Sequence, residues 1–407
     1  MITLLHIIIV HHPENEFAVQ ASKTTNRVFG LTADDSTTPS PFASESIWNA
    51  VRLSTVTGVE QLRALQLPAS ERVLWIVLAD YPMTMTGIWE EITKFIAEQI
   101  DDATVTSKVN NRRQLILFGS DDVIVRLPKK FRPYQAKNPA VLGESRMGPH
   151  RLALLALHRA RLLLARDLEK EVSMKIFLSH AKMDGVFFAD ALHNALKQVP
   201  ELEAWYDARD IGIGDHWKTE LENNASSGVF VAIRTEHYCQ RPICIEEFRW
   251  AMKQGVPIVV VDALLKPDIA PAPLPFASMP NVRIADGNTH RVLVTALREH
   301  VRMLLVETLI IEETSAAAPN LPPETWRVWP RFPGFQAIQE LLKHHQGKKT
   351  PCCVVVAETN GPEMTAAKDL LQGMRSQLRI FTAETFAFHA IVMSAEHEEL
   401  LVSGGAD

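Results

Sequence analysis

The segment from Lys175 to Met252 constrains the fold most, because short apolar runs alternate in it with helical patterns and end abruptly in polar residues. One run is Lys175-Ile-Phe-Leu-Ser-His-Ala181, and another extends from Gly228 to Ile233. Strands that alternate with helices predict βαβ units and a parallel sheet. Ligands of such sheets lie beyond the carboxyl ends of the strands, so we expect a site where these runs end.

Three polar clusters fall at such positions. The first is Phe177-Leu-Ser-His180, at the end of the first run. The second is Trp205-Tyr-Asp207 with the loop Ala208-Arg-Asp-Ile-Gly-Ile-Gly-Asp215, after which Trp217 lies on a new helical segment. The third is Thr235-x-x-Tyr238-x-x-Arg241-x-x-Cys244-x-x-Glu247, which leads into a helix.

In order and spacing these clusters resemble the TIR (Toll/interleukin-1 receptor) domain, more closely in its bacterial forms, over about residues 172–310. The resemblance implies a flavodoxin-like parallel sheet in the centre of an α/β chain. It also implies an activity, because TIR domains include enzymes that cleave the bond between nicotinamide and ribose in NAD⁺. NAD⁺ is then a substrate and no cofactor is expected. The implied role is bacterial anti-phage defence or signalling.

Glu247 matches the glutamate that this family requires. Nicotinamide leaves without a general acid because it is a cationic leaving group, and positive charge then builds up on the ribose. One carboxylate against the ribose can orient the sugar and stabilise that charge. Adjacent helical residues project about 100° apart, so only one of Glu246 and Glu247 faces the cleft, and the spacing from Cys244 favours Glu247. The simpler alternative for Glu247 is a solvated carboxylate at a helix start.

The resemblance implies further site residues. Beside the catalytic glutamate, the residues expected to contact substrate are Phe177, Ser179, His180, Asp207, Arg209, Trp217, Thr235, Tyr238, Ile243 and Cys244. The loop with Arg209, Asp210, Gly212 and Gly214 is expected to mediate self-association. The tryptophans that flank this loop have a simpler interpretation as core aromatics. No metal site is expected.

Two positions depart from the bacterial pattern. Ile243 stands where these relatives usually carry a tryptophan, which removes an aromatic surface for stacking. Thr235 replaces the usual serine and keeps a hydroxyl. The rival hypothesis is therefore a catalytically weak or inactive TIR scaffold that acts through TIR–TIR self-association. A flavodoxin-like response module is a weaker third class, because the first strand ends in Ser-His and lacks the acidic pair of a phosphoryl-accepting receiver.

Composition limits the partners. A net charge of -6 argues against a general nucleic-acid binder, and no segment is apolar for long enough to span a membrane. The four cysteines, Cys239, Cys244, Cys352 and Cys353, show no metal-ligand spacing and fit a reducing cytoplasm. We therefore expect a cytoplasmic protein whose partners are NAD⁺, other copies of itself, and an activating partner or ligand recognised by flanking domains.

The length of 407 residues predicts two or three domains. The expected parts are an N-terminal α/β domain (1–170), a TIR domain (171–312), a Pro-rich linker (313–334) and a small C-terminal α/β region (335–407). The first domain is interpreted either as an independent unit or as a degenerate TIR-like one. The apolar segment His150 to Lys170 is expected to be its closing helix, or alternatively a self-association or domain-bridging surface. The C-terminal region is too small for a large core, so we expect it to dock on another domain or a partner.

Overall fold

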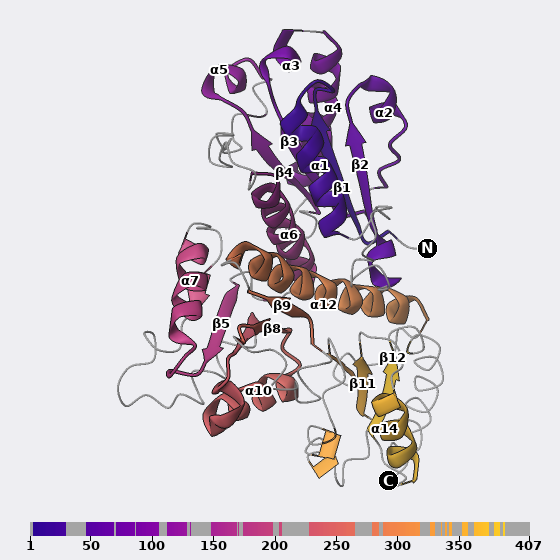
Figure 1. Ribbon diagram of the computed structural model, residues 1–407. Helices are drawn as coiled ribbons and strands as arrows, with labels where there is room; N and C mark the ends of the chain where they lie inside the picture. The colour runs from indigo at the N-terminus through magenta and orange to yellow at the C-terminus, as the bar shows by residue number, and fades with distance from the viewer. Residues whose placement is uncertain are drawn as a thin grey trace, which may run out of the picture. The chain divides into compact units, whose positions relative to one another are not determined.

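The computed structural model describes residues 3–29, 46–68, 71–85, 87–105, 112–127, 131, 148–168, 170, 174–197, 203–205, 228–264, 279–284, 288–317, 326–329, 335, 338–339, 342–343, 352–356, 362–373, 378–382 and 386. The chain divides into two compact units, Met1–Lys170 and Glu171–Asp407, whose elements are labelled in Figure 1.

The first unit contains a four-stranded parallel sheet. Its strands are β1 (Leu5–His11), β2 (Val51–Val56), β3 (Val73–Leu78) and β4 (Arg113–Phe118), in the order β2-β1-β3-β4. Strands β1 and β3 are buried along their whole length, as expected for central parallel strands with helices on both faces. The sequence predicted β1, β3 and β4 but not β2, because polar residues interrupt the apolar pattern of this edge strand.

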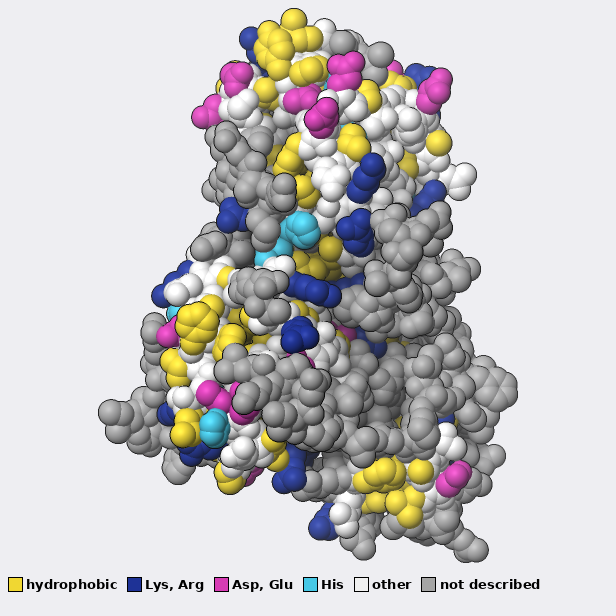
Figure 2. Space-filling view, viewed as in Figure 1, with side chains coloured by type: hydrophobic (Ala, Val, Ile, Leu, Met, Phe, Trp, Pro, Cys, Tyr) yellow, Lys and Arg dark blue, Asp and Glu magenta, His cyan; other side chains and the backbone are white. Residues whose placement is uncertain are grey.

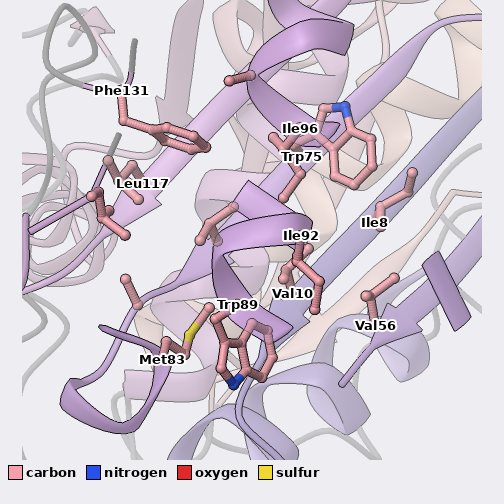
Figure 3. Packing of buried hydrophobic residues seen from close by; sticks show 14 of the residues in the cluster. Ile8, Val10, Val56, Trp75, Met83, Trp89, Ile92, Ile96, Leu117 and Phe131 are labelled. Carbon is pink, nitrogen blue, oxygen red and sulfur yellow. The ribbon is translucent and has the colours of Figure 1, made fainter. Parts of the chain in front are cut away.

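Helices cover both faces of this sheet. Helices α1 (Glu16–Val28) and α6 (Gly148–Asp167) contact each other on one side, and α6 also packs against β3 and β4. Helix α6 is thus the closing helix that the sequence predicted. Helices α2 (Val59–Arg63), α3 (Tyr81–Met85) and α4 (Gly87–Val105) lie together on the other side. Figure 3 shows the core beneath them, and the shorter elements are η1 (Ser46–Ala50) and α5 (Asp121–Ile124).

The second unit contains the predicted flavodoxin-like sheet. Its strands are β5 (Lys175–His180), β6 (Glu203–Trp205), β7 (Val229–Arg234), β8 (Ile258–Asp262) and β9 (Asn281–Arg283). All pairs are parallel and the order is β6-β5-β7-β8-β9, so the predicted fold class is confirmed. The elements around this sheet are α7 (Val186–Lys197), η4 (Tyr238–Gln240), α10 (Pro242–Gln254) and α12 (Thr289–Ala317). Helix α12 contacts α7, β7 and β8, whereas α10 contacts β5 and β7.

A small parallel sheet follows in the second unit. It consists of β10 (Trp326–Trp329), β11 (Cys352–Val356) and β12 (Leu378–Thr382) in that order, with α14 (Pro362–Gly373) packed on it. The prediction of a linker over 313–334 is wrong where the structure describes it, because α12 continues to Ala317 and β10 lies in this range. A short edge strand tolerates flanking prolines, and the prolines around β10 made this segment resemble a linker in the sequence. The strand expected near 388–393 lies outside the described residues.

The described surface carries charges of both signs. Figure 2 shows acidic and basic side chains intermixed on the face in view, with hydrophobic side chains also reaching the surface over α7. Phe187 of α7 is 76% exposed. Within the described residues, no helix is both long and apolar enough to cross a membrane.

The C-terminal sheet touches the end of α10 through Trp329. Helix α10 ends at Gly255, which adopts a left-handed conformation with φ of 69°. The indole of Trp329 packs against this glycine so closely that a Cβ there would overlap Cδ1 and Nε1 of the ring. Gly255 is therefore required twice, for the backbone conformation and for the close approach of the tryptophan.

We predict that Gly255→Ala destabilises the second unit by at least about 1 kcal/mol, because left-handed backbone disfavours a Cβ and Trp329 must also shift. Denaturant unfolding followed by tryptophan fluorescence measures this loss. Gly87→Ala is the matched control, since a Cβ at the start of α4 would meet no atom within 4 Å. Equal stability of the two variants would contradict both the left-handed backbone at Gly255 and its close contact with Trp329.

Candidate functional site

Glu247 lies in the second turn of α10 and is only 3% exposed. Helix α10 begins at Pro242, whose fixed φ suits a first helical position. The next residue after Glu247, Phe248, packs edge-on against Phe230 of β7, with ring centroids 6.2 Å apart. These contacts turn Glu247 toward the sheet, so its interpretation as a solvated helix-start carboxylate is wrong.

Ser179 holds the Glu247 carboxylate. It lies on β5 two residues after Phe177, whose ring stacks on Phe230 at 5.2 Å, so both side chains leave the strand on the side of α10. The Ser179 hydroxyl donates to Oε2 of Glu247 at 2.6 Å, a short hydrogen bond of the charge-assisted kind. Oη of Tyr238 lies 2.8 Å from the same hydroxyl oxygen. Because the single serine proton is committed to the carboxylate, Tyr238 donates to Ser179.

We call Ser179, Tyr238 and Glu247 the buried triad. Burial raises the pKa of the Tyr238 phenol well above its ordinary value; its hydrogen bond with Ser179 acts in the opposite direction, and the nearby Glu247 charge adds to the rise. The phenol therefore stays protonated and remains a donor. Two further contacts pack around the triad: the Tyr238 hydroxyl lies 3.4 Å from the Cys244 carbonyl, and the Cys244 thiol lies 3.6 Å from the His180 carbonyl.

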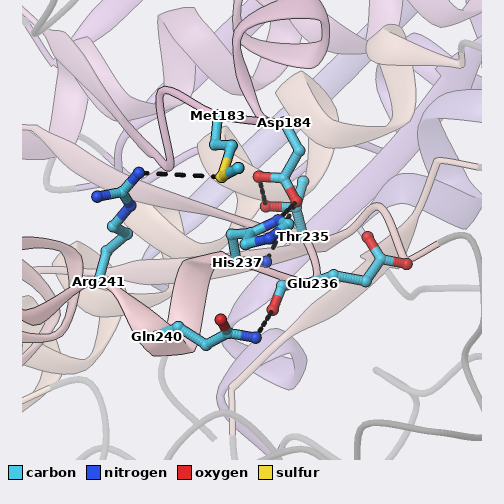
Figure 4. A network of polar contacts seen from close by, with 7 residues as sticks. All are labelled: Met183, Asp184, Thr235, Glu236, His237, Gln240 and Arg241. Carbon is cyan, nitrogen blue, oxygen red and sulfur yellow. Dashed lines mark hydrogen bonds and ion pairs between the residues drawn. The ribbon is translucent and has the colours of Figure 1, made fainter.

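A second polar cluster lies at the end of β7 and is drawn in Figure 4. The Thr235 hydroxyl donates to Oδ1 of Asp184 at 2.6 Å, and the backbone N–H of His237 donates to Oδ2 at 3.1 Å. Nδ1 of His237 also lies 2.8 Å from Oδ2. Burial alone would raise the pKa of Asp184, but these hydrogen bonds outweigh it and lower the pKa. The cluster joins β7 to the segment that precedes α7.

The rim beside this cluster is exposed. Ile243, in the first turn of α10, is 48% exposed and offers an apolar surface without an aromatic ring. Arg241 and Met183 lie next to each other, with 4.0 Å between Nη2 and Sδ (Figure 4). Asp184 and His237 were not among the residues expected from the sequence. An aspartate shortly before a helix is a recognisable signal, whereas the role of His237 follows only from the fold.

The structure brings together part of the predicted set. Ser179, Tyr238, Cys244 and Glu247 meet between β5 and α10, with Phe177 packed beside them. Thr235 belongs to the Asp184 cluster instead. His180 is buried at the end of β5, and Ile243 lies exposed at the rim. The other predicted residues lie outside the described part of the chain: Asp207, Arg209, Asp210, Gly212, Gly214 and Trp217. Among the described residues, no group of three His, Cys, Asp or Glu side chains is arranged to hold a metal ion.

Comparison with protein families gives one match. Residues 176–292 match the sequence model described as the TIR domain. This range contains Ser179, Tyr238, Cys244 and Glu247, and it lies within the 172–310 for which the sequence predicted a resemblance. None of the curated proteins compared with the chain matches it.

We predict that Ser179→Ala costs more stability than Tyr238→Phe. The first variant removes the hydroxyl that bonds to both Glu247 and Tyr238, at a cost of about 2–3 kcal/mol, whereas the second removes only the Tyr238 hydroxyl, at about 1 kcal/mol. Urea unfolding measures both losses. Thr308→Val is the control, since its buried hydroxyl bonds only to the Leu304 carbonyl of the same helix. A Ser179→Ala variant as stable as this control would contradict a coupled triad.

Proposed function

We propose that the TIR domain within residues 176–292 of this chain is an NAD⁺ nucleosidase that cleaves the bond between nicotinamide and ribose, with Glu247 as its catalytic residue. The supporting observation is the short hydrogen bond by which Ser179 orients the Glu247 carboxylate. This carboxylate lies near the carboxyl ends of β5 and β7, the two strands between which the order of the sheet reverses. Flavodoxin-like proteins bind ligands at this point of the sheet.

The chemistry requires one oriented negative charge. When the C–N bond breaks, its electron pair goes to the nicotinamide nitrogen, which becomes neutral, and the ribose carbon becomes cationic. A carboxylate already held in place stabilises that cation without having to reorganise during the reaction. Water then attacks the ribose carbon in hydrolysis, or an adenine nitrogen does so in cyclisation. Ser179 and Tyr238 support Glu247 in this scheme.

Substrate access sets a further condition. Since Glu247 is only 3% exposed, contact with a ribose requires that substrate binding uncover the carboxylate. The exposed Ile243 provides an apolar contact at the rim, but no aromatic ring for stacking on a nicotinamide or adenine base. The proposed setting is the bacterial cytoplasm, where NAD⁺ depletion or signal production would serve anti-phage defence. This setting rests on family resemblance alone.

The second candidate is a TIR scaffold that acts without catalysis. The burial of Glu247 and the isoleucine at position 243 favour it, because both limit contact between the carboxylate and a bound nucleotide. TIR domains commonly self-associate, and a scaffold would use that property alone. The loop proposed for self-association, with Arg209, Asp210, Gly212 and Gly214, lies outside the described residues.

Glu247→Gln tests the enzymatic proposal. The amide keeps the size of the side chain but removes its charge, so we expect nicotinamide release to fall at least about a hundredfold. Mass spectrometry of the products distinguishes ADP-ribose from a cyclic product. Glu246→Gln is the matched control, because this neighbour on the same helix is exposed, and it should retain activity. Equal activity in the Glu247→Gln variant would exclude Glu247 as the catalytic residue.

Self-association predicts that activity depends on protein concentration. We expect nicotinamide release per molecule to rise with concentration, in parallel with the mass measured by sedimentation, because the proposed assembly would complete the site. Glu247→Gln should assemble equally well without activity. A monomeric mass with constant specific activity would contradict the assembly requirement. Assembly without any nicotinamide release in the unaltered chain would favour the scaffold.

A further inference from the structure

The two units share one strand order. Counted along the chain within each unit, the first four strands lie in the order second, first, third, fourth in both sheets. In both units the helix after the first strand contacts the helix that follows the last strand of the sheet, α1 with α6 and α7 with α12. The last residue of the first strand pairs with Leu78 in the first unit and with Ile233 in the second. Nine residues after these two positions, α4 begins in the first unit and α10 in the second. Strand order alone shows only a fold class.

The strand register makes the correspondence specific. The first strand of each unit ends in a histidine, His11 in β1 and His180 in β5. His11 pairs with Leu78 of β3, and His180 pairs with Ile233 of β7. Aligning the two histidines therefore also aligns the third strands and the segments that follow them.

In both units, a side-chain hydrogen bond joins the segment after the first strand to the segment after the third strand. In the first unit, the Asn15 side chain donates to Oδ2 of Asp80 at 3.1 Å. In the second unit, the Thr235 hydroxyl donates to Oδ1 of Asp184 at 2.6 Å. Asn15 lies four residues after His11, and Asp184 lies four residues after His180. Asp80 and Thr235 each lie two residues after the residue that pairs with that histidine. A shift of one residue would break this agreement, so the alignment is unique.

The buried cores agree under this alignment. In every aligned pair that follows, the first residue belongs to the core cluster around Trp75 and the second to the core cluster around Phe230. The pairs are Ile8 and Phe177, Trp75 and Phe230, Val77 and Ala232, Met83 and Tyr238, Trp89 and Cys244, Ile96 and Ala251, and Leu117 and Val260. The same positions of the fold therefore build the core in both units.

The two units differ where the buried triad lies. The positions of Ser179, Tyr238 and Glu247 are occupied in the first unit by Val10, Met83 and Ile92, respectively. These three apolar side chains are all buried and belong to the single core cluster that Figure 3 shows. Apolar side chains therefore fill this space in the first unit, whereas hydrogen-bonded polar side chains fill it in the second.

Physical coupling explains why all three positions differ together. A lone carboxylate or hydroxyl in an apolar core loses its hydration without gaining a partner, which is strongly unfavourable. Replacing a complete buried network by apolar residues is often neutral or stabilising. The three positions are therefore expected to be polar together or apolar together, as the two units are.

We propose that residues 1–170 are a second, non-catalytic copy of the TIR fold, in which Val10, Met83 and Ile92 replace the buried triad position for position. The family model that matches residues 176–292 does not extend to this unit. The structural proposal is independent of NAD⁺ cleavage. Only its consequence, that the chain carries one cleaving centre and uses its first unit as a non-cleaving domain, rests on the function proposed above.

The first test transfers the apolar set into the second unit of the full-length chain. The matched variant is Ser179→Val, Tyr238→Met and Glu247→Ile, and its control carries the same residues permuted, as Ser179→Met, Tyr238→Val and Glu247→Ile. We expect the matched variant to melt roughly 5 °C or more above the permuted one, because each residue enters the position to which the first unit adapts it. A permuted variant that melts as high as the matched one would overturn the positional equivalence.

The second test works in the opposite direction and keeps the proposal falsifiable if the first variants fold poorly. Ile92→Glu places a lone carboxylate in the core of the first unit and should lower its melting temperature sharply. Adding Val10→Ser and Met83→Tyr should recover part of that loss, because the serine would bond to the new carboxylate and the tyrosine to the serine, as in the second unit. The permuted pair, Val10→Tyr with Met83→Ser, should recover none. Absence of recovery by the matched pair would overturn the proposal.

The consequence for activity has its own measurement. If the first unit does not cleave NAD⁺, Glu247→Gln in the full-length chain should release nicotinamide no faster than buffer alone. Residual release that survives Glu247→Gln but is lost on changing the first unit would overturn the non-catalytic assignment. An unaltered chain that releases no nicotinamide would refute the proposed function, while the melting experiments would still decide whether the first unit is a copy.

Discussion

The hydrogen bond from Ser179 to Glu247 is the interaction on which the site depends, because a carboxylate buried without a partner would not be tolerated in this core. Its partners are 68 residues apart in the sequence. The bond forms only when β5 and β7 pair and α10 packs on them, so the fold must be complete before the charge can be accommodated. Tyr238 extends the same bond one step further into the core, and its raised pKa keeps it a donor.

Helix α10 is fixed at several points. Pro242 begins it, Phe248 joins it to the aromatic core, and the left-handed Gly255 ends it against Trp329. Trp329 belongs to the C-terminal sheet, so a part of the chain beyond the TIR match contributes to the support of the helix that carries Glu247. Strand β10 thus helps to fix the end of α10, a role that its local sequence does not indicate.

The two units have the same backbone arrangement but different side chains at the three positions of the buried triad. Both units have the same strand order, the same register between the first and third strands, and a cross-link at the same place. They differ in whether the space between the first strand and the helix after the third strand is filled by hydrogen-bonded polar side chains or by apolar ones. The same fold thus carries polar side chains at three positions in one unit and apolar ones in the other, so the fold alone does not imply a chemistry.

The sequence by itself determined the parallel α/β class, the central strands and the choice between Glu246 and Glu247. The class and the strands follow from apolar runs that end in polar residues. The angle between adjacent helical residues turns only one of the two glutamates inward, and the spacing from Cys244 in the family pattern selects Glu247. The structure agrees, since Glu246 is exposed and Glu247 is buried. Ser179, Tyr238 and Thr235 were predicted as site residues only through the resemblance to the TIR domain.

Only the tertiary structure decided what these residues contact. Tyr238 is fully buried behind Ser179, Thr235 bonds to Asp184, and Ile243 is exposed at the rim. Strands β2 and β10 and the equivalence of Ile92 with Glu247 likewise required the sheet registers. The physical reason is that hydrogen-bond partners and core neighbours are selected by the packing of segments far apart in the chain, whereas periodicity and spacing report only on neighbours along it.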